Sequence, residues 1–306
     1  MKTEFQEHYE VAVFAALKAG EILRRHFAAG VSATEKFEGE ATQGLVTVAD
    51  LEAEAAIIKT IQDVFPDHAF LAEESSATGD NADHLWVIDP LDGTNNFAFG
   101  IPHFAVSIAY WQNGQPVVGV VLDPLRSEQF AAVKGCGATL NGDPVSVSQF
   151  RDVQESVVAT GFYYDRGEMM SQTLRCVETL FRNQIRGIRR MGAATLDLAW
   201  VASGRYGAFF ELTLAPWDFR RCSIDCHRSW RANFRLRRQR NWAGENIGTG
   251  HQWTVARSNV DAAKRTLVQR YNKKYGLSKL AVLALATVFG VSTVASAKTA
   301  DPKIKR

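Results

Sequence analysis

The most constraining feature of the sequence is a run of acidic and small residues that follows an apolar segment. Leu85–Ile88 is strand-like, and it leads into the nonapeptide Asp89–Phe97, with the sequence DPLDGTNNF. Its two carboxylates lie three residues apart around a proline-stiffened turn, so both can face one cavity. A second strand-like run, Ala69–Ala72, also ends in acids, Glu73 and Glu74. Carboxylates at strand ends are typical of the edge where α/β proteins place their chemistry.

The residue types in this run indicate a metal site as well as a turn. Asp-Pro and Asp-Gly, each taken alone, are ordinary turn dipeptides. The combination with the neighbouring acids is less ordinary, because it offers only oxygen ligands. Oxygen ligands suit a hard cation such as Mg²⁺, whereas zinc would call for nitrogen or sulfur. We therefore expect Mg²⁺ beside a phosphate pocket.

The periodicity of apolar residues predicts helices and strands along the first two thirds of the chain. An amphipathic helix is expected from Phe5 to Phe27 with Gly30 as its stop, and Asp50 is expected to be the N-cap of a second helix. Further strands are expected at Ala105–Trp111, Pro116–Leu122, Glu128–Val133, Ser156–Thr160 and Ala208–Leu212, further helices around Glu168–Asn183 and Thr195–Ser203, and turns at Asn113-Gly114 and Asn141-Gly142. The hairpin-like succession favours a mixed or antiparallel sheet over a simple doubly wound one.

At this point the chain resembles a known family. Asp89–Phe97 matches the D-P-x-D-G-T-x-N-F signature of the inositol monophosphatase family, and Leu71–Ser75 matches the segment before it. Other matching segments are Val46–Asp50, Gly135–Gly142, Arg190–Ala194, Leu196–Leu198, Gly204-Arg205 and Glu211–Asp218, so the resemblance covers about residues 5–219. It implies an α/β (α+β) fold, a layered αβαβα sandwich of the sugar-phosphatase type. The two lobes would comprise residues 1–150 and 151–271.

The resemblance also implies a metal-ligand set. Glu73, Asp89 and the backbone carbonyl of Leu91 would hold one Mg²⁺. Asp89, Asp92 and Asp218 would hold a second, so that Asp89 bridges the ions, and two or three ions are expected in all. For Asp218 a role as a helix N-cap is an open alternative that is compatible with ligation.

Catalytic and substrate-binding roles follow from the same resemblance. Glu73 and Thr94 would orient the water that attacks phosphorus, and Asp50 would accept a hydrogen bond from the Thr94 hydroxyl. Glu211 would bind substrate hydroxyl groups. The full implied set of substrate-binding residues is Asp92, Gly93, Thr94, Ala193, Ala194, Glu211 and Asp218.

The implied function is that of a Mg²⁺-dependent phosphomonoesterase acting on inositol monophosphate or a related polyol or sugar phosphate. Alternatives within the family are a phosphatase for fructose bisphosphate, histidinol phosphate or a phosphoadenosine nucleotide. An alternative of another class is an inactive or RNA-associated protein. By resemblance we expect a homodimer and no nucleic-acid partner. Four cysteines in 306 residues do not form a disulfide framework, and no apolar signal segment opens the chain, so a reducing cytoplasm is expected.

The charge distribution changes abruptly near residue 219. Residues 1–219 hold 16 Lys+Arg and 29 Asp+Glu, whereas residues 220–306 hold 19 and 4. Where the family continues with a W-D-x-A-A-G helix, this chain has Arg220-Arg221-Cys222-Ser223. With suitable codons, residues 222–231 read one base later give Ala-Ala-Leu-Ile-Val-Thr-Glu-Ala-Gly-Gly, the missing helix. We therefore hypothesise a one-base slip near Phe219 that is restored near Gly244, making residues 220–243 frame-shifted.

Two other readings of the stretch after Asp218 stay open. Its eight arginines up to Trp242 could form a nucleic-acid patch, and Cys222, Cys226 and His227 could form a metal site. The tail at residues 272–306 resembles a secretory signal peptide, with Lys273-Lys274, an apolar run and an A-x-A-like end. It could be read-through into another coding sequence, a docked helix or a membrane anchor. A membrane is expected as a partner only if this tail inserts.

Overall fold

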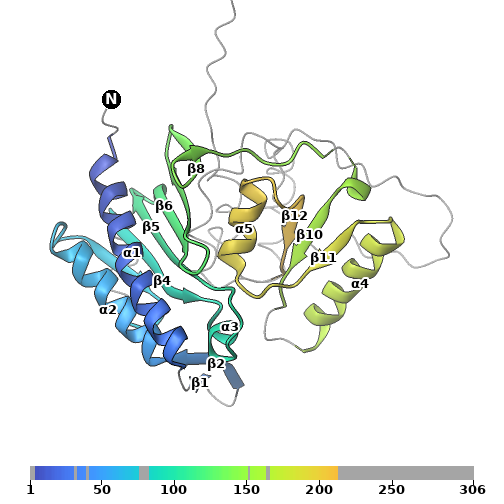
Figure 1. Ribbon diagram of the computed structural model, residues 1–306, viewed down its shortest axis with the longest axis horizontal. Helices are drawn as coiled ribbons and strands as arrows, with labels where there is room; N and C mark the ends of the chain where they lie inside the picture. Colours follow the sequence, from blue (N-terminus) through green and yellow to red (C-terminus); the bar gives the residue numbers. More distant parts are fainter. Residues whose placement is uncertain are drawn as a thin grey trace, which may run out of the picture.

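Five layers of secondary structure follow one another across the molecule (Figure 1). The structure is a computed structural model, and it describes residues 4–30, 33–38, 41–75, 83–150, 152–162 and 166–212. Helices α1 and α2 lie on one face of a seven-stranded sheet, and α5 lies between the other face and a three-stranded sheet that α4 covers. This arrangement confirms the expected αβαβα layering.

The element bounds are as follows. The helices are α1 (Gln6–Ala29), α2 (Val48–Gln62), α3 (Thr94–Ala98), α4 (Glu168–Arg182) and α5 (Ala194–Ala202), with a 3₁₀ turn at Val153–Glu155. The strands before this turn are β1 (Ala33–Glu38), β2 (Ala41–Thr47), β3 (Ala69–Ala72), β4 (His84–Asp92), β5 (Ala105–Gln112), β6 (Gln115–Asp123), β7 (Glu128–Val133), β8 (Gly137–Leu140) and β9 (Asp143–Pro144). The strands after it are β10 (Val157–Thr160), β11 (Gly187–Arg189) and β12 (Ala208–Phe210).

The large sheet is mixed, as predicted. Its strands run in the order β3-β4-β5-β6-β7-β8-β9; β3 and β4 pair in parallel and every later pair is antiparallel. Both predicted turns join antiparallel neighbours. Asn113, Gly114, Asn141 and Gly142 all have positive φ, the conformation that tight two-residue hairpin turns require and that Asn-Gly adopts readily. The second lobe is built on a smaller parallel sheet, in the order β11-β10-β12.

Helix α1 confirms the predicted amphipathic helix, and it ends at Gly30 with φ 72°. Its buried side is made of small residues, among them Ala12, Ala15, Ala16 and Ala19. A Cβ on Gly20 would lie 2.8 Å from Leu122 Cδ2. Small side chains therefore allow this helix to lie close against β6 and to bury the first-lobe core.

Some local predictions were wrong. Thr47, not Asp50, is the N-cap of α2: the Thr47 side chain accepts from the Ala49 N–H at 3.2 Å, while Asp50 at N3 accepts from the Thr47 N–H at 2.8 Å. This reciprocal arrangement is a capping box, in which both positions carry side-chain acceptors. Strand β4 also extends through Asp92, so Asp89 and Asp92 lie among the last residues of the strand and not beyond its end. The prediction that the last strand reaches Leu212 was two residues too long.

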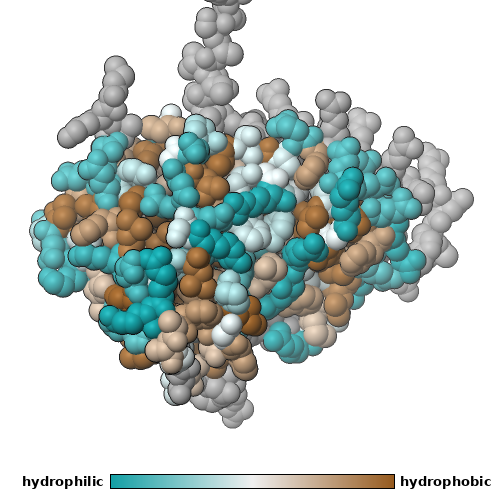
Figure 2. Space-filling model, viewed as in Figure 1, coloured by the Kyte–Doolittle hydropathy of each residue, from teal (hydrophilic) through white to brown (hydrophobic). Residues whose placement is uncertain are grey.

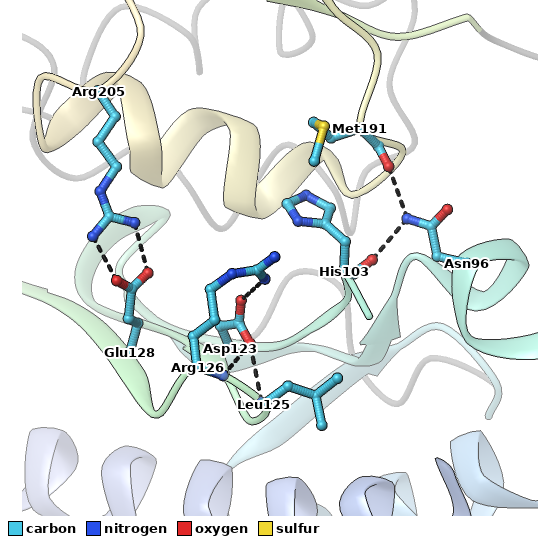
Figure 3. Close-up of polar contacts among 8 residues, drawn as sticks. All are labelled: Asn96, His103, Asp123, Leu125, Arg126, Glu128, Met191 and Arg205. Atoms are coloured by element: carbon cyan, nitrogen blue, oxygen red, sulfur yellow. Dashed lines mark hydrogen bonds and ion pairs between the residues drawn. The ribbon is translucent and has the colours of Figure 1, made fainter. Parts of the chain in front are cut away.

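A polar clamp joins the two lobes away from the predicted acids (Figure 3). Arg205, which follows α5, forms two hydrogen bonds with Glu128 on β7, at 2.6 and 2.5 Å. Arg126 pairs with the buried carboxylate of Asp123 at the end of β6. The ring of Trp200 on α5 has the Arg126 and Arg205 guanidinium carbons 5.6 and 5.2 Å from its centroid. Cation–π contacts and ion pairs thus hold α5 on the large sheet.

The described surface carries several exposed apolar side chains: Phe14, Leu17, Val48, Leu51, Val64, Phe99, Ile101, Leu174 and Phe181. On the face drawn in Figure 2, apolar surface forms separate patches between hydrophilic ones. No helix in the described part of the chain is both long enough and apolar enough to cross a membrane. The frame-shifted segment and the signal-like tail predicted from the sequence lie outside the described residues.

Candidate functional site

The predicted acids meet where strands β3 and β4 end side by side. Asp89 is fully buried and Asp92 is 8% exposed, while Glu73 follows β3 and is half-buried. Burial raises the pKa of Asp92 to about 6; hydrogen bonds from Thr195 oppose this rise, and the nearby charge of Glu73 adds to it. Parallel pairing of β3 with β4 is what delivers these carboxylates to one edge.

The end of β4 is shaped by its proline. Pro90 has no N–H to donate, and the pairing of β4 with β5 is irregular between Asp89 and Asp92. The N–H of Leu91 turns instead to Asp89 Oδ1, at 3.0 Å. This local bond orients the Asp89 carboxylate and leaves the Leu91 carbonyl to accept from the Thr94 hydroxyl, at 3.0 Å.

The structure brings Asp50 and Thr94 together. Asp50 Oδ1 lies 3.3 Å from the Thr94 hydroxyl oxygen, and Asp50 Oδ2 accepts from the Thr47 hydroxyl at 2.6 Å. A hydroxyl has one proton, so Thr94 donates to Asp50 or to the Leu91 carbonyl at any moment. In either case its lone pairs remain able to accept a hydrogen bond from a water. The expected hydrogen bond between Asp50 and Thr94 therefore has a geometric basis.

A buried acid that was not predicted from the sequence, Glu54, supports the part of the site that carries Asp50 and Glu73. Glu54 on α2 is 4% exposed, and its Oε2 accepts from the backbone N–H of Glu74 at 2.9 Å. Because Glu74 directly follows Glu73, this bond ties the acidic turn after β3 to helix α2. Glu54 follows Asp50 by four residues, so both acids lie on one face of that helix, a spacing that could have revealed it.

The second lobe contributes backbone donors. Asp92 Oδ2 accepts from the Thr195 N–H at 2.7 Å and from the Thr195 hydroxyl. Helix α5 has Ala193 as its N-cap, with no side-chain cap of its own, so Asp92 caps it from the other lobe. Gly93 has φ 97°, and a Cβ there would lie 3.3 Å from Ala193 Cβ. Thr195 was not among the site residues predicted from the sequence. No sequence motif marks its contact with the acids at the end of β4.

Glu211 lies at the far side of the same site. Burial raises its pKa to about 7, against the opposing effect of the Arg190 guanidinium. A Cβ on Gly161 would lie 1.9 Å from Glu211 Oε2, so a glycine is needed where β10 ends. Burial, followed by the charges of Asp92 and Glu211, raises the pKa of Asp197 to about 8. Gly161 and Asp197 are further residues that the sequence reading did not single out.

The donor chemistry of the site fits Mg²⁺, because the groups at the strand ends are carboxylates and a carbonyl. Burial raises the pKa of Asp92 and the nearby charge of Glu73 adds to the rise, so a cation at this edge would stabilise the ionised carboxylate. Within the described residues, no group of three or more His, Cys, Asp or Glu side chains is arranged to hold a metal ion by itself. The remaining predicted ligand, Asp218, lies outside these residues. The metal set from the sequence therefore stays a prediction.

Comparison with known proteins gives consistent results. Residues 4–220 match the inositol monophosphatase family. The Nus factor SuhB of Escherichia coli K12 is 44% identical over 212 residues, which are 68% of this chain and 78% of the relative. The inositol monophosphatase structure from Anabaena is 38% identical, with a TM-score of 0.62 over 72% of this chain and 81% of that one. SaIMPase-II, solved with inositol monophosphate bound, is 25% identical, with a TM-score of 0.56 over 71% and 77%. This chain belongs to the inositol monophosphatase family.

Proposed function

We propose that the chain is a Mg²⁺-dependent phosphomonoesterase that hydrolyses inositol monophosphate or a related polyol or sugar phosphate. The observation that carries the proposal is the convergence of Asp89, Asp92 and Glu73 at one sheet edge, beside the paired Asp50 and Thr94. Family membership supports it, because the family is generally Mg²⁺-dependent. Inositol monophosphate is bound in the structure of SaIMPase-II.

The residues that would hold Mg²⁺ are Glu73, Asp89, Asp92 and the carbonyl of Leu91, with Asp218 from outside the described part. When bound, Mg²⁺ supplies Lewis-acid chemistry: it lowers the pKa of water and offsets the negative charge of a phosphate.

The chain's own residues would then orient the nucleophile. Asp50 is acceptor-only when ionised, so the Thr94 hydroxyl would donate a hydrogen bond to it and keep its own lone pairs available to accept from a water. A water that donates to Thr94 and to Glu73 is thereby aimed at phosphorus. Glu211, Ala193 and Ala194 line the side where the polyol would lie, and a carboxyl of Glu211 whose pKa is near neutral can accept or donate to substrate hydroxyl groups.

The experiment that tests this function is a phosphate-release panel with Mg²⁺. Its substrates are inositol monophosphate, fructose bisphosphate, histidinol phosphate and a phosphoadenosine nucleotide, the alternatives within the family. Release from inositol monophosphate at the highest kcat/KM supports the proposal. Preference for another substrate would replace the substrate while keeping the reaction class. No release from any of them, by either the folded present chain or a folded chain in which residues 220–243 are restored to the family's reading frame, would reject the phosphatase.

A second candidate function follows from the name of the E. coli relative, a Nus factor. We propose to test it by asking whether this chain replaces the E. coli protein in a strain that lacks it. The Asp92→Asn version serves as the matched arm, because it should abolish phosphatase turnover. Rescue by both versions would favour a non-catalytic role, while rescue by the unchanged chain alone would favour the phosphatase. A cytoplasmic location and a homodimer remain part of the proposal.

A further inference from the structure

One of the junctions between the two lobes lies where the end of β4 and the start of α3 meet the turn before α5 and its first turn. Three contacts define this junction: Asp92 accepts from Thr195, Gly93 lies against Ala193, and Asn96 bonds to Met191. The first of these involves a predicted metal ligand, whereas Asn96 has no role in the reaction proposed above. Asn96 lies two residues after Thr94 and is 6% exposed.

The side-chain amide of Asn96 bridges the lobes (Figure 3). Its Nδ2 donates to the carbonyl oxygen of His103 at 2.7 Å, in the segment before β5, and to the carbonyl oxygen of Met191 at 2.8 Å, before α5. Both partners are carbonyl oxygens, which only accept, so the nitrogen and not the oxygen of the amide must face them. An NH₂ group has two protons, and both are used here.

The partner turn is shaped to receive this amide. Gly192 has φ 87°, in the left-handed region. A Cβ at this position would lie 3.2 Å from Asn96 Nδ2 and 3.3 Å from Asn96 Oδ1, and 2.7 Å from Arg190 Nη1. A side chain on residue 192 would therefore push the turn away from Asn96, so the glycine permits the close approach.

The hydrogen bond between Asn96 and Met191 lies next to the start of α5. Met191 precedes Ala194, the first residue of α5, by only three residues. The N–H of Thr195, one residue later, is the donor to Asp92. Because α5 has no side-chain cap of its own, the placement of its first turn depends on the turn that Asn96 holds and on Asp92.

We propose that Asn96 is a positioning residue whose side-chain amide fixes the first turn of α5 against Asp92 and thereby orients the Asp92 carboxylate. Asn96 acts through Met191 and Thr195 and touches no reacting atom. The effect on turnover rests on the proposed phosphatase function, while the effect on the junction itself does not.

The direct test is amide hydrogen exchange on the full chain, comparing Asn96→Ala with Asn95→Ala. Asn95 is the neighbouring asparagine, and it is exposed. Loss of the two bonds should speed exchange of the amides at 193–197 by about tenfold in Asn96→Ala, with β6 amides unchanged and Asn95→Ala like the parent chain. Equal acceleration in β6 and at 193–197 would show general destabilisation and overturn the proposal, as would unchanged exchange at 193–197.

A second variant separates hydrogen bonding from volume and serves if Asn96→Ala does not fold. Asn96→Asp keeps the shape of the side chain but turns an acceptor toward two carbonyl oxygens. It should disturb residues 193–197 at least as much as Asn96→Ala. Exchange like that of the parent chain in Asn96→Asp would mean that the side chain only fills space, which would overturn the proposal.

The kinetic arm uses phosphate release with Mg²⁺ by the same variants. Misorientation of Asp92 should lower kcat and raise the Mg²⁺ concentration needed for half-maximal rate, with little change in KM for substrate. A rise in KM alone would contradict a positioning role through Asp92. If neither the parent chain nor a frame-restored chain releases phosphate, the proposed function fails, and the exchange data alone decide the role of Asn96.

Discussion

The two walls of the candidate site are built from different groups. The first-lobe wall, made of Asp50, Glu73, Asp89, Asp92 and Thr94, presents carboxylates and a hydroxyl. The second-lobe wall, made of Gly161, Ala193, Ala194, Thr195 and Glu211, presents backbone N–H groups, space left by a glycine and one acid of raised pKa. In the proposed mechanism the chemistry is concentrated on the first wall, and the second wall would hold and select the substrate. Substitutions on the two walls should therefore have different kinetic signatures.

The largest effect is expected at the acids of the first-lobe wall. Asp92→Asn and Asp89→Asn should each lower kcat by several orders of magnitude, because each removes a charged oxygen ligand from the proposed Mg²⁺ site. Steady-state phosphate release measures the effect. Asp63→Asn, at an exposed acid on the far end of α2, is the matched control and should turn over like the parent chain. Near-normal rates in the first two variants would show that these acids are structural.

Thr94→Ala should lower kcat by about 10²-fold with a much smaller change in KM, because the hydroxyl orients the water and adds little to ground-state binding. Thr94→Ser keeps the hydroxyl near Asp50 and should recover most of the rate. A change confined to KM would move Thr94 from the chemistry of the first wall into substrate binding. That outcome would remove the contrast between the walls.

Glu211→Gln tests the second-lobe wall and should raise KM by about tenfold, with kcat within a few-fold of the parent value. The reason is that Glu211 contacts substrate hydroxyl groups in the proposed site and lies apart from the attacking water. Glu178→Gln, an exposed acid on α4, provides the control. A loss of kcat as large as that of Thr94→Ala would place chemistry on both walls.

The smallest effect concerns stability and lies away from both walls. Burial, followed by the charges of His84 and His8, lowers the pKa of His68 to about 4, and Asp67 opposes this. In the unfolded chain, where this histidine has its ordinary pKa of about 6.5, it binds more protons than in the folded one. The contribution of His68 to stability is therefore complete above about pH 6.5, falls as the pH drops below it, and levels off below about pH 4.

The variant His68→Asn checks this pH dependence. The Asn oxygen can replace His68 Nδ1 as the acceptor for the Trp86 indole N–H, which donates at 3.0 Å, and Asn does not titrate. Melting temperatures measured between pH 7 and 5 should fall less steeply in the variant than in the parent chain. Parallel curves would assign the pH dependence to other groups.

The sequence predicted the first-lobe wall better than the second, for a physical reason. Periodic apolar residues specified α1 and the strands β3 and β5–β7, and the acids at the strand ends are visible as side chains in the sequence. The capping box of α2 was misassigned because Thr47 and Asp50 are both residue types that cap helices. The strands β9 and β11, of two and three residues, are too short to show a period.

Most of the second-lobe wall could not be predicted in the same way, because apart from Glu211 and the Thr195 hydroxyl it acts through backbone N–H groups and through missing side chains. The N–H of Thr195 would be a donor with any residue other than proline, so this backbone contact with Asp92 leaves no mark in the sequence. Gly161 and Gly192 matter for the side chain they lack, against Glu211 and Asn96 respectively. Only the folded chain shows which side chains they face.

The hypothesis of a one-base slip concerns the residues after the second wall, and resequencing the gene tests it. The family match ends at residue 220, next to the proposed slip near Phe219. Arg220, Arg221 and Asp225 stand where the family has small and apolar residues, and burying unpaired charges costs several kcal/mol each. We therefore expect a frame-restored chain to be more stable and more active than the present one. DNA that lacks a compatible slip would reject the hypothesis.

The most direct test of the central claim is phosphate release from inositol monophosphate by the present and the frame-restored chains, each with Mg²⁺ and with excess EDTA. Asp92→Asn versions are run in parallel. The account predicts Mg²⁺-dependent release that is strongest in the restored chain, weak in the present chain, and abolished by EDTA and by Asp92→Asn. Release that persists in EDTA or in Asp92→Asn, or its absence from both folded chains, would contradict a metal-dependent phosphatase built on the first-lobe wall.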